Sequence, residues 1–142
     1  MTDFVELDIT EALARQINDV VFEPDVDLSH PGVAYEPAEK PWISVSHHFA
    51  PPVQADFGET GRNRYTGYMS VGVYTLTGEG LTCGLKLAAQ VVSAFKRSTK
   101  LTYNGRVVSI DVQPHVSDPV EARGWIQIPV TVRWRSDNNP VT

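Results

Sequence analysis

The sequence lacks several features on which common protein functions depend. It has one cysteine, Cys83, so an internal disulfide and a zinc site built on several thiolates are both excluded. It has no run of about 18 apolar residues that could span a bilayer. The start Met1-Thr2-Asp3 is acidic, whereas a signal peptide begins with basic residues. We therefore expect a soluble protein made in the cytosol, without membrane contact.

Catalytic and cofactor-binding motifs are also missing. Gly78-Glu79-Gly80 resembles the start of a dinucleotide-binding turn, but the third glycine position holds Cys83 and no acidic residue follows about 20 residues later. No serine lies in a Gly-x-Ser-x-Gly motif, and Cys83 has no identifiable base partner. The paired carboxylates Asp25 and Asp27 lie in an acidic stretch, where we expect them to be solvated. The sequence predicts no enzyme activity and no cofactor.

The histidines do not show the spacing of a metal site. His47 and His48 are neighbours in a predicted strand, so their side chains point to opposite faces. His30 or His115 could join one of them, but a metal site needs three or four converging ligands. We predict no metal ion, and we interpret Cys83 as a buried structural residue.

Charge is divided unevenly along the chain, whose net charge is −5. Residues 1–60 hold 12 acidic and 2 basic side chains, whereas residues 61–142 hold 5 acidic and 10 basic side chains. An acidic protein without a basic stripe is a poor nucleic-acid binder. Contact between the acidic half of one copy and the basic half of the next would give a head-to-tail ring or filament. Two separately solvated faces are the alternative.

The first part of the chain predicts a helix, a long loop and a strand. Apolar residues at helical spacing after capping-box pairs predict a helix over about 4–22. Residues 23–41 are rich in proline and acidic residues, which predicts an exposed loop. Trp42 to Phe49 alternates as a strand does. Residues 50–63 predict a projecting hairpin with Phe57 near its tip.

A strand followed by a helix forms the predicted centre of the domain. Arg64 to Leu76 alternates over its whole length, and an amphipathic helix is predicted from Leu81 to Arg97 after the glycine-rich break. Helical spacing groups apolar residues into a face that we expect to cover Met69, Val71 and Val73. The residues of this helical face are Leu81, Leu85, Ala88, Val91, Val92 and Phe95.

The last part of the chain predicts two strands and a tail. Asn104-Gly105 predicts a tight turn, and a strand over 106–113 follows it. Trp125 to Arg135 alternates cleanly, but Pro129 cannot donate to a ladder, which predicts an edge position. Residues 113–123 are interpreted as a connection. Residues 136–142 are expected to be a flexible tail.

Together these elements predict a single α+β domain over residues 1–142, in the order αββαββ. We expect a mostly antiparallel four-stranded sheet with two helices packed on one face, and with the proline-rich loop and the long hairpin projecting. The other sheet face is polar and aromatic, which suits a subunit interface as well as solvent. Its residues include Tyr68, Tyr74, Thr131, Arg133 and Arg135.

The layout resembles the tail terminator proteins (gpU-like) of long-tailed, siphovirus-type bacteriophages. The resemblance covers nearly the whole chain and rests on strand order, the proline-rich loop after the first helix and the character of the last strand. The residues that carry it are Pro41-Trp42-Ile43, the strand Gly67 to Tyr74, the Gly78-to-Gly80 break and the strand from Trp125 to Val132.

This resemblance implies a virion structural protein that forms a hexameric ring on the end of the tail tube. Such a ring stops tube polymerisation and offers a surface to head-completion proteins in the neck, while DNA passes through without specific binding. It implies assembly in the host cytoplasm and a final position at the head-proximal end of the tail. Subunit or tube contacts are expected at Arg62, Arg64, Arg133, Arg135, Phe57, Tyr68 and Tyr74, with the 23–41 loop and the 50–63 hairpin reaching a neighbour.

Two alternatives remain open. Another neck or connector protein, such as a head-closure or tail-completion protein, would share ring symmetry but bind the portal side. A small-molecule binding domain or enzyme would instead use a pocket between helix and sheet near His47 and Cys83.

Overall fold

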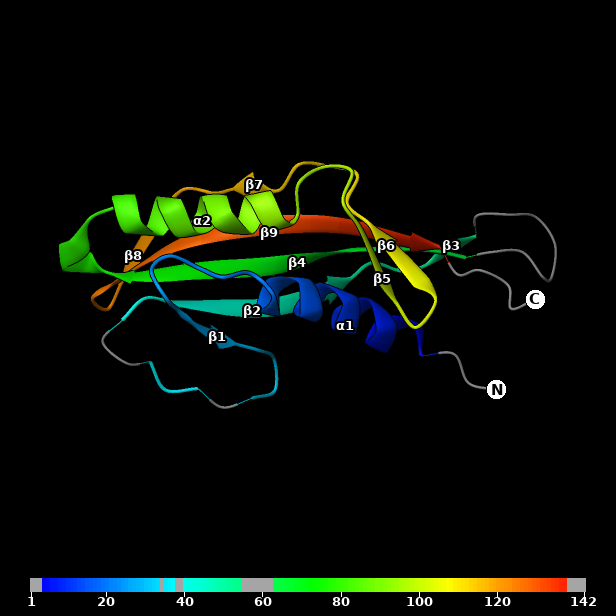
Figure 1. Ribbon diagram of the computed structural model, residues 1–142, viewed down its shortest axis with the longest axis horizontal. Helices are drawn as coiled ribbons and strands as arrows, with labels where there is room; N and C mark the ends of the chain where they lie inside the picture. Colours follow the sequence, from blue (N-terminus) through cyan, green and yellow to red (C-terminus); the bar gives the residue numbers. More distant parts are fainter. Residues whose placement is uncertain (1–3, 34, 38–39, 55–62, 138–142) are drawn as a thin grey trace.

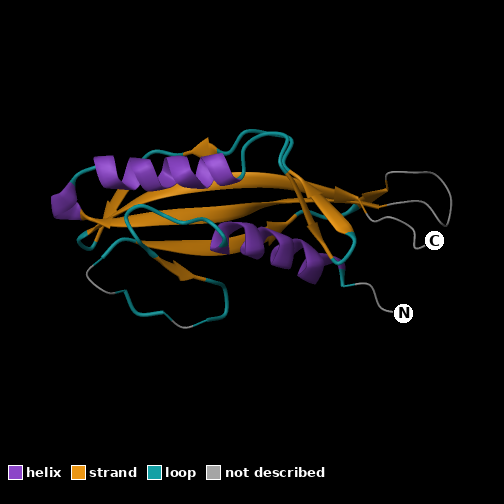
Figure 2. Ribbon diagram, in the orientation of Figure 1, coloured by secondary structure: helices purple, strands orange, loops and turns teal. Residues whose placement is uncertain are grey.

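The computed structural model describes residues 4–33, 35–37, 40–54 and 63–137, which form a nine-stranded sheet and two α-helices (Figures 1 and 2). The strands along the main path of the sheet follow the order β1-β2-β4-β9-β6-β5, and β3, β7 and β8 pair at its sides. The elements are α1 (Val5–Asn18), β1 (Asp27–Ser29), β2 (Trp42–Phe49), β3 (Val53–Gln54), β4 (Asn63–Leu76), a 3-10 turn (Thr77–Glu79), α2 (Thr82–Ala94), β5 (Lys100–Tyr103), β6 (Arg106–Ser109), β7 (His115–Val116), β8 (Val120–Ala122) and β9 (Trp125–Asp137).

The predicted fold class is wrong. The sheet has nine strands instead of four, the order αββαββ does not describe it, and its orientation is mixed because β1 runs parallel to β2. Four of the unexpected strands, β1, β3, β7 and β8, contain only two or three residues. Such short strands show no readable alternation, so only their pairing with longer neighbours identifies them.

Two long strands, β4 and β9, run side by side along the length of the molecule (Figure 1). They are antiparallel, and their register extends from Arg64 opposite Asp137 to Leu76 opposite Trp125. β2 pairs with the other side of β4, so that Trp42 lies opposite Tyr74. Because side chains alternate across a strand, this register sorts the residues of all three strands into two faces.

One face of these three strands is the core, and both helices pack on it. Its fully buried residues include Ile43 of β2, three residues of β4 and three of β9. The other six are Met69, Val71, Val73, Ile128, Val130 and Val132. The alternation of the sequence therefore identified the buried positions of the long strands correctly.

The orientation of α2 differs from the prediction. Leu81 and Leu85 were expected in the core, but they are 45% and 47% exposed, and Leu87 is fully buried instead. The helix approaches the sheet through Gly84, where an added Cβ would lie 2.6 Å from Ile128 Cδ1. Because glycine has no side chain, the helix packs closely along this line. Leu81 and Leu85 are displaced to its flank.

The first helix is shorter than predicted and ends at Asn18. One of its acidic residues, Asp8, is buried and faces the side chain of Arg106, with 3.5 Å between Arg106 Nε and Asp8 Oδ2. A buried carboxylate needs such a cation nearby to offset its lost hydration. This pair ties α1 to the β5–β6 hairpin, whose Asn104-Gly105 turn has positive φ values, as its sequence predicted.

The acidic stretch after α1 was expected to be an exposed loop throughout, but β1 lies within it. Lys40 contacts Asp27 at 3.0 Å, and the Tyr35 hydroxyl donates a hydrogen bond of 3.1 Å to the same carboxylate. The Lys40 ammonium, followed by the Tyr35 hydroxyl, lowers the pKa of Asp27 below its ordinary value. These contacts hold β1 against the start of β2.

Two expectations about the last strand are also wrong. Pro129 predicted an edge strand, but β9 lies between β4 and the short strands β7 and β8. The Pro129 carbonyl accepts a hydrogen bond of 2.8 Å from the Ser117 N–H. Because the nitrogen and the carbonyl of one residue point to the same side of an antiparallel strand, the Pro129 nitrogen faces the interval between β7 and β8. The predicted tail also begins too early, because β9 includes Ser136 and Asp137. Ser136 is buried and its hydroxyl donates to the Val107 carbonyl at 2.8 Å, whereas residues 138–142 lie outside the described residues.

Candidate subunit interface

The sheet surface opposite the helices is here termed the helix-free face. It carries the residues of β2, β4 and β9 that alternate with the core residues, and it is polar and aromatic. Five of the seven residues proposed as contacts from the sequence lie on it. The helix-free face comprises Trp42, Ser44, Ser46, His48, Arg64, Thr66, Tyr68, Ser70, Tyr74, Gln127, Thr131, Arg133 and Arg135.

One end of the helix-free face is an aromatic cluster. The rings of Trp42 and Tyr74 stack at 4.0 Å, and Trp125 meets Trp42 edge-on at 6.3 Å. The Tyr35 ring also packs against Trp42, with the ring centroids 5.1 Å apart. Tyr74, one of the predicted contact residues, is half-buried in this cluster. Its ring is therefore already packed within its own subunit and primarily stabilises the β2–β4 pairing.

The other end of the helix-free face offers an exposed arginine beside an exposed tyrosine. Tyr68 and Arg133 are opposite one another in the β4–β9 register, and both are exposed. The His48 ring stacks on Tyr68 at 4.4 Å, which fixes the position of the phenol. Arg133 makes no hydrogen bond or ion pair with any residue that the structure describes. Its guanidinium is available to a partner.

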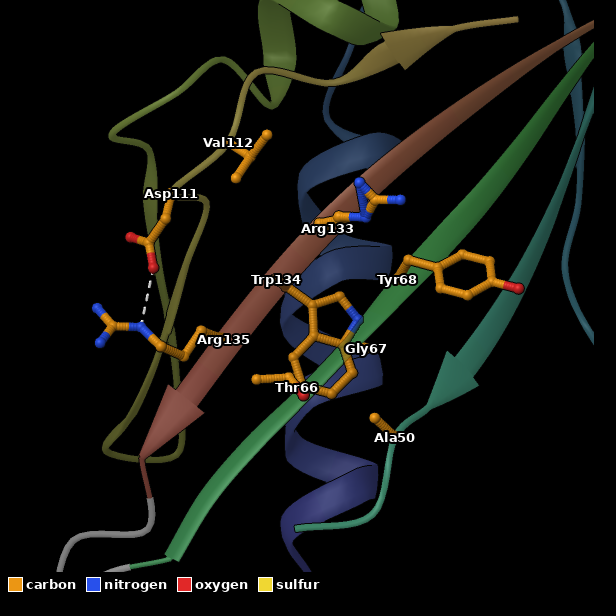
Figure 3. Close-up of a pocket in the computed structure, with 9 residues that line it drawn as sticks. All are labelled: Ala50, Thr66, Gly67, Tyr68, Asp111, Val112, Arg133, Trp134 and Arg135. Atoms are coloured by element: carbon orange, nitrogen blue, oxygen red, sulfur yellow. Dashed lines mark ion pairs between the residues drawn. The ribbon is translucent and has the colours of Figure 1, made fainter. Parts of the chain in front are cut away.

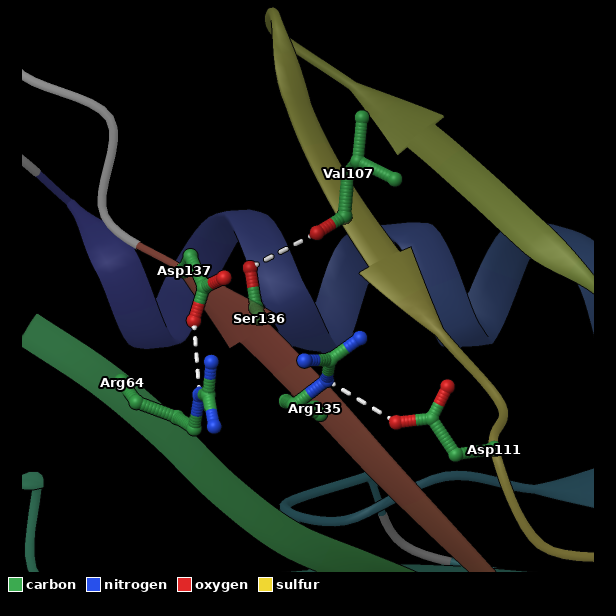
Figure 4. Close-up of polar contacts among 6 residues, drawn as sticks. All are labelled: Arg64, Val107, Asp111, Arg135, Ser136 and Asp137. Atoms are coloured by element: carbon green, nitrogen blue, oxygen red, sulfur yellow. Dashed lines mark hydrogen bonds and ion pairs between the residues drawn. The ribbon is translucent and has the colours of Figure 1, made fainter. Parts of the chain in front are cut away.

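The neighbouring arginines are engaged within the subunit (Figure 4). Arg135 Nε lies 2.9 Å from Asp111 Oδ2, and Arg64 Nε lies 3.1 Å from Asp137 Oδ1. Both pairs are partly exposed, so each contributes little to stability on its own. Their effect is to fix the two arginine side chains and to neutralise their charge, which leaves Arg133 as the free cation among these three residues.

A shallow hollow lies at this end of the helix-free face. It has a volume of about 370 Å³ and is open to solvent (Figure 3). Arg133 and Tyr68 stand at its edge, and Arg135 turns toward Asp111. The hollow combines a free guanidinium with a largely apolar floor. This arrangement suits docking of another protein surface better than enclosure of a small molecule.

Two predicted contact residues cannot be placed. Phe57 and Arg62 lie outside the described residues, as does the predicted hairpin tip. The base of the hairpin is described, because β3 pairs with β4 with Val53 opposite Arg64. Sequence reasoning missed His48, although its position in the same strand as Trp42 places both side chains on one face.

A second hollow lies between α1 and β2, on the helix-covered side. This α1–β2 cleft has a volume of about 560 Å³ and is lined by residues that include Glu11, His30, His47 and Phe49. His30 Nε2 and Asn18 Oδ1 are 2.9 Å apart, which links the segment after β1 to α1. Burial, followed by the nearby His30 and His48, lowers the pKa of His47 below its ordinary value, so its imidazole is neutral near pH 7.

Within the described residues, no three histidine, cysteine or carboxylate side chains are grouped as metal ligands. No helix in that part of the chain is long and apolar enough to cross a membrane.

The arrangement can therefore be compared with known proteins. A family model described as phage tail terminator protein matches residues 8–134. The chain belongs to this family. The match extends over α2 and most of α1 and of the sheet, so the resemblance inferred from the sequence is confirmed.

Solved structures show the same fold as this tail terminator family member. One match, with a title that states no function, has a TM-score of 0.80 at 16% identity and covers 98% of this chain and 100% of the other. A second, titled virion of native gene transfer agent particle, has a TM-score of 0.63 at 16% identity and covers 96% of this chain and 100% of the other. No curated protein matches the chain. The family assigns this tail terminator protein a structural role in the virion tail and association with other tail components.

Proposed function

We propose that this tail terminator protein forms a ring, a hexamer, that caps the completed tail tube. The ring ends tube polymerisation and presents the surface that joins the tail to the head. The observation that carries the proposal is the family match over residues 8–134. This range includes all the helices and strands except the start of α1 and the last residues of β9. The fold shared with a virion component supports it.

The partners in this proposal are further copies of the chain, the tail tube protein and a head-completion or connector protein. The protein assembles in the host cytoplasm and is finally located at the head-proximal end of the tail. DNA passes through the ring without specific binding. The net charge of −5 supports this last point, because an acidic ring does not retain a phosphate backbone.

Subunit contacts in this proposal involve the helix-free face, with Arg133 and Tyr68 as the exposed residues that reach a neighbour. Arg64 and Arg135 were proposed as contacts on the basis of the sequence, and each also pairs with an acidic residue of its own subunit. Charge reversal at Arg135 would break its pair with Asp111. Arg133→Glu is therefore the cleaner test of a contact between subunits.

The deciding experiment is negative-stain electron microscopy of the purified protein at high concentration, alone and mixed with tail tube protein. We expect closed six-fold rings and tubes of limited length that carry a cap at one end. A tube sample without this protein is the control for spontaneous tube length. Monomers alone, with tubes that grow as in the control, would contradict the proposal. Binding to a portal-side protein without binding to tubes would instead favour a head-closure or tail-completion protein.

A further inference from the structure

The outward side of α1 carries a row of residues that are exposed or only partly buried in their own subunit. These residues recur at helical spacing, and the two at the helix start are large and apolar, with Phe4 59% and Leu7 54% exposed. The row continues along the helix to the α1–β2 cleft. Its members are Phe4, Leu7, Glu11, Ala14 and Asn18. An exposed apolar row of this kind on a structural protein indicates a contact with another protein.

The centre of this row is a carboxylate without a partner. Glu11 makes no ion pair or hydrogen bond with any described residue, although it lines the cleft. Phe49 of β2 also lines the cleft, and its side chain is 46% exposed. Glu11 is the single carboxylate among the residues that line the cleft, and neither lysine nor arginine is among them. A carboxylate facing an aromatic ring is a suitable environment for a guanidinium, which pairs with the first and packs on the second.

The same chain carries a matching group on its other side. Arg133 on the helix-free face is exposed and has no partner among the described residues, and Tyr68 stands next to it. The row on α1 consists of apolar side chains and one anion. The end of the helix-free face consists of an aromatic ring and one cation. Glu11 belongs to the acidic half of the sequence and Arg133 to the basic half, so the two surfaces carry the charges of their halves.

We propose that in the assembled protein the Arg133 side chain of one copy enters the α1–β2 cleft of the next copy and pairs with Glu11. This inference rests on the proposed ring and names the contact that closes it. The two surfaces lie on opposite sides of the sheet, so the contact is head-to-tail. A head-to-tail contact repeats around a closed ring, whereas a contact between identical patches would stop at a dimer.

A charge swap tests this pairing. Glu11→Arg and Arg133→Glu are made singly and together on one chain, and the protein concentration at half-maximal ring assembly is measured by analytical ultracentrifugation. Each single variant places two like charges at the contact, so we expect it to need at least about tenfold more protein than the wild type. The chain with both changes restores opposite charges at every contact. We expect it to assemble within about threefold of the wild-type concentration.

The matched control uses Glu6, which is exposed on the same helix but does not line the cleft. Glu6→Arg changes the net charge by the same amount, and it should not rescue Arg133→Glu. Far-ultraviolet circular dichroism of each monomer establishes that the variants fold, and Glu11→Gln tests the loss of the anion without a new cation. Glu11→Gln should weaken assembly by a smaller factor than Glu11→Arg.

Three results would overturn the pairing while leaving the proposed function intact. The first is assembly of Glu11→Arg at the wild-type concentration, and the second is a double variant whose defect equals the product of the two single defects. The third is rescue of Arg133→Glu by Glu6→Arg to the same extent as by Glu11→Arg, because the effect would then depend on net charge and not on the pairing. A wild-type protein that forms no rings and caps no tubes would contradict the proposed function itself, and the pairing with it.

Discussion

At the scale of single residues, Gly67 of β4 approaches its neighbours more closely than any other described glycine does. A Cβ at this position would collide with the His48 carbonyl oxygen and would lie 2.6 Å from Cζ2 of Trp134. The Trp134 ring also contacts Phe49 edge-on at 5.8 Å. Gly67 thus allows the large indole to lie directly over the central strand, and it supports the end of the sheet that bears Arg133.

We expect Gly67→Ala to lower the free energy of unfolding by about 1–3 kcal/mol, which is typical of overpacking at a site that cannot relax. The clash with a main-chain oxygen outweighs the smaller entropic gain that alanine brings in a strand. Urea denaturation measures the change. Gly78→Ala is the control, because nothing lies within 4 Å of its added Cβ, and it should shift stability by less than about 0.5 kcal/mol. Equal effects of the two changes would show that the close contact at Gly67 is absent.

His47 should make stability depend on pH. Burial lowers its pKa in the folded state below the ordinary value of 6.5. As pH falls below about 6.5, the unfolded chain binds a proton that the folded protein resists, so the free energy of unfolding decreases. This decrease continues until the pH reaches the pKa of the folded state. Above pH 6.5 His47 contributes no pH dependence.

We therefore expect the urea midpoint to fall between pH 7.5 and pH 5, and to fall less in His47→Gln. His115→Gln is the control, because His115 is exposed on β7. A pH dependence of His47→Gln identical to that of the wild type would contradict this assignment.

At the scale of elements, a single side chain connects α2 to the segment that leaves α1. The amide of Gln90 donates to the Glu23 carbonyl at 2.8 Å, and the Glu23 N–H donates to the Gln90 carbonyl oxygen at 2.9 Å. The Gln90 amide thereby pairs with the main chain of Glu23 as a neighbouring strand would. It positions the start of the acidic stretch that leads to β1.

We expect Gln90→Ala to lower the free energy of unfolding by about 0.5–1.5 kcal/mol and to raise the rate of amide hydrogen exchange at Glu23. Lys86→Ala, one turn earlier on the same helix, keeps the Gln90 contacts and should change neither quantity appreciably. Unaltered exchange at Glu23 in Gln90→Ala would show that other contacts hold this segment.

At the scale of the whole molecule, the division of charge acquires a structural meaning. Arg133 stands on the helix-free face and Glu11 on a helix that covers the core, and neither makes an ion pair with another described residue. The sheet separates them, so one molecule cannot pair them internally. Other opposite charges, such as Arg135 and Asp111, do pair within the subunit. The contact proposed between Arg133 and Glu11 would therefore join two different copies of the chain.

Strong local patterns determined a large part of this protein. The alternation in β2, β4 and β9 fixed which residues are buried, because burial on one face requires a period of two. The Asn104-Gly105 turn was equally clear, since few other residues accept its positive φ values. The proline-rich stretch after the first helix, the Gly78-to-Gly80 break and the alternating last strand indicated the tail terminator family, although the predicted element order was wrong.

Only the tertiary structure decided the rest. The short strands β1, β3, β7 and β8 exist because a long neighbour supplies their hydrogen bonds, and no local pattern encodes that pairing. The orientation of α2 follows from close approach at Gly84, which outweighs the periodicity that favoured Leu81 and Leu85. Which arginine remains free depends on acidic residues that are distant in sequence, such as Asp111 for Arg135 and Asp137 for Arg64. Periodicity describes one element at a time, whereas pairing and charge compensation depend on what the folded chain brings together.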